Sequence, residues 1–196
     1  MFVGRKKELD ALNSRYKSNR KEFGVLYGRR RIGKSSILNE FLKGKKGILF
    51  QAKQDNSYGN LKSFSYEVDH LLNLPDTFVF ASWQHAFKSI QEYAKNERFV
   101  LIIDEYPYIV SQDSSFSSVL QEFIDHTSDN MMVILSGSDI GFLQKEIQNH
   151  ASPLYKRRTF EMEIKKMNFM DAKEFVKMED VESQANYLCL MSGYPY

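Results

Sequence analysis

One short motif constrains this chain more than any other feature of its sequence. Residues 28–35 read Gly-Arg-Arg-Arg-Ile-Gly-Lys-Ser and match the pattern G-x-x-x-x-G-K-[ST] at every fixed position. The apolar run Phe23–Tyr27 precedes the motif, and a segment of helical periodicity, Ser35–Leu42, follows it. A strand, a glycine-rich turn and a helix in this order predict a phosphate-binding loop.

The spacing of the motif has a physical reason. Glycine lets the loop turn its backbone N–H groups inward, and the following helix presents its positive end to the same anion. Lys34 then reaches the β- and γ-phosphates, Ser35 offers its hydroxyl to Mg²⁺, and Ser36 is placed to contact the α-phosphate. The alternative is a glycine turn with a surface lysine. We predict ATP and Mg²⁺ as ligands, with nucleotide contacts from Gly28, Arg29, Arg30, Arg31, Ile32, Gly33, Lys34, Ser35 and Ser36.

A second motif supplies carboxylates. The apolar run Phe99–Asp104 is the most strongly β-forming stretch of the chain and is followed by Glu105. A strand of a parallel sheet delivers its last residue into the ligand crevice. We therefore expect Asp104 to hold Mg²⁺, through water, and Glu105 to orient or deprotonate the attacking water.

Two further groups are candidates for the catalytic set. Ser136 follows the apolar run 131–135. It senses the γ-phosphate or holds the nucleophilic water, or else it is an ordinary exit from a strand. Arg157 and Arg158 precede the last predicted strand. They either bring positive charge to the transferring phosphoryl group, in the same chain or in a neighbouring subunit, or form a solvated surface pair.

Strands alternate with helices along the chain. Strands are expected at 23–27, 47–51, 99–104, 131–135 and 159–164, and helices at 8–16, 35–42, 61–72, 83–93, 119–126, 171–178 and 183–191. This alternation predicts an α/β fold, a central parallel five-stranded sheet with helices on both faces. Strands cease near Lys166, so we expect a core over 1–166 and the beginning of a helical lid over 167–196.

Composition narrows the class of protein further. The apolar fraction of 42% is that of a folded globule, and the apolar runs are too short to span a bilayer. A single cysteine and the lack of a secretory signal at the N-terminus predict a cytoplasmic protein without an internal disulfide. The net charge of +2 does not by itself indicate a nucleic-acid-binding protein.

Five segments together carry a family resemblance. They are Phe2-Val-Gly-Arg-Lys-Lys-Glu-Leu9, the loop 28–36, Leu101-Ile-Ile-Asp-Glu105, Ser152-Pro-Leu-Tyr-Lys-Arg157 and Ser192-Gly-Tyr-Pro195. In this order the chain resembles the prokaryotic AAA-like ATPases that are abundant in archaea, which are related to the STAND class of signalling NTPases. The resemblance implies a P-loop NTPase three-layer sandwich of the ASCE/AAA-like kind.

The resemblance also implies roles that spacing does not show. Gly4 and Arg5 would lie by the adenine or ribose, and Pro195 of the lid would approach the base from the other side. Arg157 matches the arginine of a family segment, although Lys156 replaces the usual glycine there, and Ser192 replaces the first glycine of the lid motif. Family members generally continue into a winged helix and often a nuclease-like domain. We therefore expect this chain to be the N-terminal part of a longer protein, with any contact to DNA made by those domains.

Three functions fit these residues. The leading one is an ATPase or ATP-dependent switch, with a homo-oligomer or a protein partner left open. The second is a nucleotide-gated binding module for a protein or nucleic acid with little hydrolysis, and the third is a kinase acting on a small molecule. The pair Asp104-Glu105 favours the first two, because a carboxylate that positions water suits hydrolysis.

Overall fold

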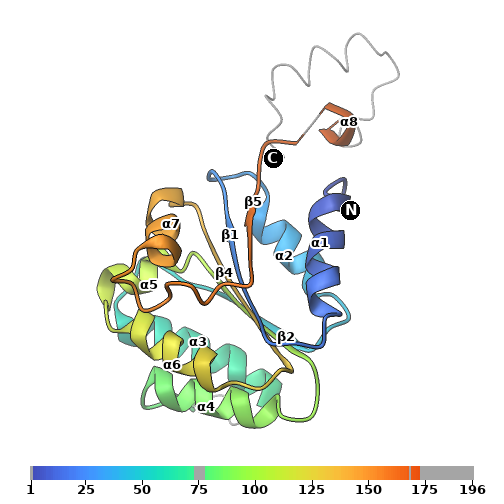
Figure 1. The fold of residues 1–196 in the computed structure, drawn as a ribbon. Helices are drawn as coiled ribbons and strands as arrows, with labels where there is room; N and C mark the ends of the chain where they lie inside the picture. The colour runs from blue at the N-terminus through green and yellow to red at the C-terminus, as the bar shows by residue number, and fades with distance from the viewer. Residues whose placement is uncertain (1, 73–77, 168, 173–196) are drawn as a thin grey trace.

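A computed structural model describes residues 2–72, 78–167 and 169–172 of the 196-residue chain. A five-stranded sheet of order β2-β3-β4-β1-β5 lies at its centre, and every neighbouring pair of strands is parallel (Figure 1). The strands are β1 (Glu22–Tyr27), β2 (Gly47–Gln51), β3 (Phe99–Asp104), β4 (Met131–Gly137) and β5 (Phe160–Glu163). The predicted α/β class and parallel five-stranded sheet are confirmed.

Helices cover both faces of this sheet. They are α1 (Lys6–Tyr16), α2 (Lys34–Leu42), α3 (Ser57–Leu72), α4 (Trp83–Tyr93), α5 (Pro107–Gln112), α6 (Phe116–His126), α7 (Ile140–Gln148) and α8 (Phe169–Ala172). In Figure 1, α1 and α2 lie on one side of the sheet, and α3, α4 and α6 lie on the other. The molecule is therefore a three-layer sandwich.

The central strands show why this layering forms. Every residue of β1, β3 and β4 is buried, as expected for strands that are covered on both faces. Successive side chains of a strand point to opposite faces. Leu101 and Ile103 accordingly belong to the core beside α3, α4 and α6, whereas Val100 and Ile102 belong to the core beside α1 and α2.

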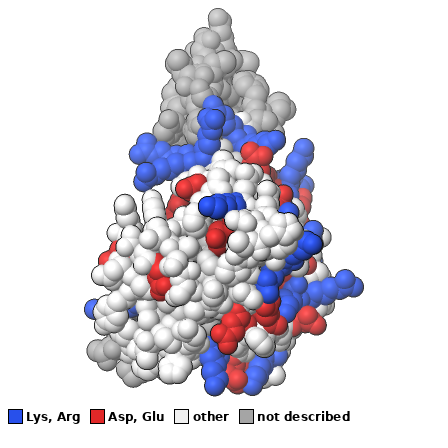
Figure 2. All heavy atoms as spheres, turned by 60° about the vertical axis from the view of Figure 1, so that its left-hand side comes forward, with Lys and Arg blue, Asp and Glu red and all other residues white. Residues whose placement is uncertain are grey.

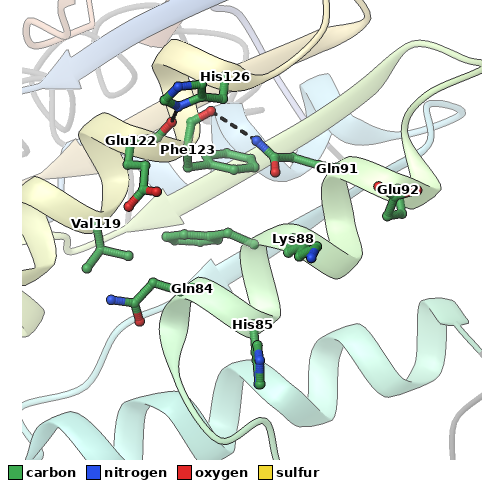
Figure 3. A pocket seen from close by; sticks show the side chains of 10 residues that line it. Gln84, His85, Lys88, Gln91, Glu92, Val119, Glu122, Phe123 and His126 are labelled. Carbon is green, nitrogen blue, oxygen red and sulfur yellow. Dashed lines mark hydrogen bonds between the residues drawn. The ribbon is translucent and has the colours of Figure 1, made fainter.

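The larger core is rich in aromatic rings. Trp83 of α4 makes edge contact with Phe116 of α6 at a centroid distance of 4.8 Å, and Phe87 stacks on Phe123 at 4.7 Å. Above these rings an open groove runs between α4 and α6 (Figure 3). Gln91 spans it, because its Nε2 donates to the Phe123 carbonyl at 3.3 Å. These contacts fix α4 against α6.

The elements differ from the sequence prediction in a few places. Helices α5 and α7 were not expected, and α3 and α6 begin four and three residues earlier than predicted. Pro107 suits the first turn of α5, and the Asp139 side chain caps α7 by accepting from Phe142 N, so both helices have local signals. The predicted helices at 171–178 and 183–191 lie almost wholly outside the described residues. Among the helices that are described, none has the length and apolar character needed to cross a membrane.

Candidate nucleotide site

The predicted phosphate loop and the predicted carboxylates meet at one edge of the sheet. Strand β1 ends at Tyr27 and leads through the loop into α2, and β3 ends at Asp104 with β4 between them. The Ser35 hydroxyl donates to Asp104 Oδ2 at 2.5 Å across 69 residues of sequence. The carboxyl edge of the sheet is therefore the candidate site, as the sequence predicts.

The shape of the loop depends on its glycines. A Cβ atom on Gly28 would lie 2.4 Å from the carbonyl oxygen of Ile164, so this position admits no side chain without movement of the backbone. Gly33 precedes α2 with a φ of 92°, and Arg31 has a φ of 62°. These left-handed residues bend the chain sharply before α2 begins.

Lys34 lies at the centre of the loop. Its side chain is buried, and Nζ donates to the carbonyls of Gly28 at 2.9 Å and Arg29 at 3.1 Å. Burial lowers the pKa of the Lys34 ammonium, and the carboxylates of Glu105 and Asp104 oppose that shift. A desolvated ammonium held over the loop is suited to bind a phosphate anion.

The two carboxylates are held differently. Asp104 is fully buried, and its Oδ1 accepts from the backbone N–H of Glu105 at 3.0 Å. Glu105 has a φ of 53°, and its Oε2 accepts from Ser138 twice, from the backbone N at 3.3 Å and from Oγ at 3.1 Å. Ser138 thus fixes the carboxylate of Glu105, which the sequence predicts to orient or deprotonate the attacking water.

Ser35 and Asp104 fit a magnesium ion. Their side-chain oxygens converge within hydrogen-bond distance, and Mg²⁺ prefers oxygen ligands. Proteins commonly bind Mg²⁺ through one or two side chains together with substrate phosphates and water. The donor set at this edge therefore suits the ion that the motif predicts.

Ser136 lies where the sequence placed it, but Ser138 was missed. Ser136 follows Leu135, the β4 partner of Ile103, so it lies at the carboxyl end of β4 beside Asp104. It is fully buried, and within the described part of the chain its Oγ has no hydrogen-bond partner. Strand β4 runs two residues further than predicted, to Gly137, so the residue that leaves the strand and reaches Glu105 is Ser138.

A second cluster behind Glu105 was also missed. The hydroxyl of Tyr106 lies 2.7 Å from Ser117 Oγ of α6 and donates to Glu146 Oε2 of α7 at 2.9 Å. Burial, and then the charge of Glu146, raise the pKa of Tyr106 well above its usual value. The network ties the residue after Glu105 to two helices. No sequence motif marks it, because its members are far apart in the chain.

Arg157 is not brought to the loop of its own chain. Its Nε and Nη2 donate to the two carboxylate oxygens of Asp125, at 2.8 and 2.9 Å. Asp125 is in the last turn of α6, and Arg157 lies before the start of β5, at the amino edge of the sheet. The length of one strand, roughly 17–20 Å, therefore separates Arg157 from the phosphate loop. Arg158 pairs with Glu161 at 2.8 Å.

The N-terminal segment binds the phosphate loop through the side chain of Arg5. Arg5 is buried, and its guanidinium donates to the carbonyl of Ile32 at 2.9 Å and to Glu8 at 2.9 Å. Gly4 has a φ of 68° and packs beside Met167 and Asp171, near the start of the predicted lid. The predicted contact of Gly4 and Arg5 with adenine stays a prediction, and Pro195 lies outside the described residues.

Positive charge gathers around the loop. Arg29, Arg30, Arg31 and Lys165 are all exposed, and the first three belong to the loop itself. Figure 2 shows lysine and arginine side chains crowding the upper end of the described body, the end at which β1 leads into the loop in Figure 1. Such a field favours the approach of a polyphosphate.

These features define the class of protein. A parallel sheet with a glycine-rich loop, a buried lysine and a strand-end Asp-Glu pair at one edge is the core of a P-loop ATPase. The model of the family described as an ATPase domain predominantly from Archaea matches residues 2–187, and the chain belongs to that family. The resemblance in the sequence is confirmed.

Two sequence relatives and one solved structure are consistent with membership of this family. The chain is 29% identical over 198 residues to an uncharacterized protein of Methanocaldococcus jannaschii, covering 100% of this chain and 43% of that protein. It is 46% identical over 46 residues to an uncharacterized ATP-binding protein of the same organism, covering 24% of this chain and 78% of that protein. The structure superposes on a Walker-type ATPase of Pyrococcus abyssi with a TM-score of 0.80 at 20% identity, covering 99% of this chain and 65% of the other, which shows the same fold. This chain spans less than half of the first relative.

Proposed function

We propose that this domain binds ATP together with Mg²⁺ at the carboxyl edge of its sheet and hydrolyses it, as an ATPase or nucleotide switch of the AAA/STAND-like kind. The observation that carries the proposal is the 2.5 Å contact between Ser35 and Asp104, with Glu105 directly after Asp104. It joins the phosphate-binding half of the site to the carboxylate half.

Each residue has a role in this scheme. The loop N–H groups and Lys34 bind the β- and γ-phosphates, and Ser35 with Asp104 hold the metal. Bound Mg²⁺ neutralises charge that develops on the phosphate oxygens. Glu105, held by Ser138, orients or deprotonates water, and Ser136, which lies beside Asp104, senses the γ-phosphate or holds that water.

The proposal also includes a homo-oligomer of this chain. An arginine at the amino edge of the sheet reaches a phosphoryl group only on a neighbouring molecule, so the role predicted for Arg157 requires a homo-oligomer. A protein partner, and DNA bound through domains beyond this chain, are further proposals for the whole protein. We also propose that a helical lid over residues 167–196 closes the site, so that the domain alone turns ATP over more slowly than a longer protein.

The second candidate is a nucleotide-gated binding module with little hydrolysis. Its support is that both donors of Ser138 bind one oxygen of the Glu105 carboxylate, Oε2, which lowers the capacity of that oxygen to accept a proton from water. Phosphate release measured for the wild type and for Glu105→Gln separates the two.

A hydrolase loses about a hundred- to ten-thousandfold in rate in Glu105→Gln, because the substitution keeps the shape and removes the base. ATP binding by the variant, measured by calorimetry, serves as the control. Equal and very slow release from both proteins supports the binding module. Radiolabel from ATP on a small acceptor would instead indicate a kinase.

A further inference from the structure

The outer face of α3 and the segment before α4 carry an unusual set of side chains. The exposed large apolar side chains identified in the described part of the chain are Tyr58, Tyr66 and Phe78, with exposed fractions of 66%, 52% and 41%. All three line one open groove of about 720 Å³. Proteins rarely leave several large rings together in water unless the patch binds something.

A lysine and a histidine alternate with the two tyrosine rings of α3. Tyr58, Lys62, Tyr66 and His70 follow one another at intervals of four residues along α3, and all four are exposed. Positions four apart on a helix lie on one side of it, so the four side chains form a stripe. The two tyrosines are separated by about 12 Å along the axis, at 1.5 Å per residue.

The charge of the groove favours an anion. Lys53 and Lys62 line it, whereas Glu67 is the single carboxylate among its lining residues. Phe78 also lines the adjoining hollow, where His85 and Lys88 are present, together with Glu92. Glu92 is paired with Lys95 at 2.5 Å. The unbalanced charge along the groove is therefore positive.

Lys53 is held in place by a buried side chain. The Asn60 side chain, 1% exposed, accepts from Lys53 N at 2.9 Å and donates to the Lys53 carbonyl at 3.0 Å. The preceding residue, Ala52, donates its N–H to the Asp104 carbonyl at 2.9 Å. The backbone of Lys53 is thus fixed at the edge of the sheet, which lowers the entropy that is lost when a ligand binds.

We propose that this groove binds a single strand of nucleic acid. Bases stack on the rings of Tyr58, Tyr66 and Phe78, and Lys53 and Lys62 contact the backbone phosphates. Exposed rings interleaved with lysines are how proteins bind single strands without reading their sequence. Since stacking and phosphate contacts do not read the 2′-hydroxyl, single-stranded DNA and RNA bind alike. In a duplex the base faces are already stacked, so a duplex binds more weakly.

Fluorescence anisotropy with labelled oligothymidine, oligouridine and a DNA duplex tests this proposal. We expect both single strands to bind the protein with affinities within a few-fold of each other, and the duplex to bind less tightly. Tyr66→Ala weakens binding by roughly five- to 150-fold, whereas Tyr66→Phe, which keeps the ring, retains it. Lys62→Ala reduces the slope of log affinity against log salt by about 0.7.

Lys43→Ala is the matched control, because Lys43 is an exposed lysine that does not line the groove. It leaves the affinity for single strands unchanged. Unchanged binding of ATP by Tyr66→Ala and Lys62→Ala, or an unchanged thermal transition where ATP does not bind, shows that the variants are folded. The proposal is overturned if no strand binds at low salt. It is also overturned if Tyr66→Ala and Lys62→Ala bind strands as the wild type does, or if the duplex binds as tightly as the single strands.

Discussion

The polar side chains at the two edges of the sheet differ in the partners that they bind. At the amino edge, charged groups bind one another and the backbone: Arg98 donates to the carbonyls of Arg20 and Asp129, and Arg157 binds Asp125 through two bonds. At the carboxyl edge, Lys34 donates to the carbonyls of Gly28 and Arg29 but forms no ion pair with a described carboxylate, and the buried Ser136 Oγ has no hydrogen-bond partner within the described residues. The carboxyl edge therefore keeps a cation and a hydroxyl that a ligand can engage.

Backbone conformation does not follow the same division. Arg31, Gly33 and Glu105 have positive φ at the carboxyl edge, but Asn19 and Lys156, which precede β1 and β5 at the amino edge, have positive φ as well. Left-handed conformations are unfavourable for residues with a side chain and persist where the surrounding structure fixes them. At the carboxyl edge the surroundings include the Arg5–Ile32 bond and the network of Tyr106.

The largest effect on ATP binding is expected from a substitution of Lys34, at the carboxyl edge. We expect Lys34→Ala to lose ATP binding at cellular concentrations, since a hydrogen bond to a charged group contributes on the order of 1.5–3 kcal/mol, or roughly ten- to 150-fold in affinity. Lys21→Ala is the matched control, because Lys21 lies just before β1 and donates to the Asp125 carbonyl at the amino edge. Calorimetry on both variants checks this. Equal affinity in the two folded variants would remove the distinction between the edges.

A smaller effect on ATP affinity is expected from a change of pH. Burial lowers the pKa of Lys34 in the free protein, and bound phosphates favour its charged form and so raise that pKa. ATP affinity is therefore full below the lowered pKa and falls as the pH rises through it, with uptake of a proton on binding in that window. Calorimetry at alkaline pH, in buffers of different ionisation enthalpy, measures the uptake. An affinity that is constant from neutral pH into the alkaline range, while the protein stays folded, would contradict this.

The smallest effect is expected at the amino edge. Arg157→Ala should change ATP affinity by less than about twofold and lower the free energy of unfolding by about 0.2–1 kcal/mol, because the Arg157–Asp125 pair is partly exposed. Thermal unfolding and ATP titration give the two numbers. A role on a neighbouring molecule would appear separately, as a phosphate release rate per site that rises with protein concentration in the wild type and not in the variant.

The arrangement of the candidate site could largely be predicted from the sequence, because that site consists of local motifs. The loop and the strand-end carboxylates are contiguous segments whose chemistry requires particular residues at fixed spacing. Arg5 illustrates what local motifs omit: its bond to Ile32 joins residues 27 positions apart and depends on how α1 packs. Ser138 was missed because the end of β4 was placed two residues early, although a serine after a strand was the correct signal.

The fold was predictable for the same reason, and one of the two helices that were not expected is short. Strands β3 and β4 are continuous apolar runs, which a sheet covered on both faces requires. Helix α5, by contrast, has six residues, too few for a periodic pattern to be recognised. The position of Arg157 at the amino edge follows from its place before a strand of a parallel sheet, whereas its pairing with Asp125 joins residues 32 positions apart and no motif marks it.

The central claim is that Ser35 and Asp104 join the two halves of one Mg²⁺–nucleotide site, and calorimetric titration of ATP with Mg²⁺ and with EDTA tests it most directly. The wild type should bind ATP more tightly with Mg²⁺ than without it. Asp104→Asn should lose that gain and retain the metal-free affinity, because the loop and Lys34 are unchanged. A gain from Mg²⁺ that is as large in Asp104→Asn as in the wild type would contradict the account.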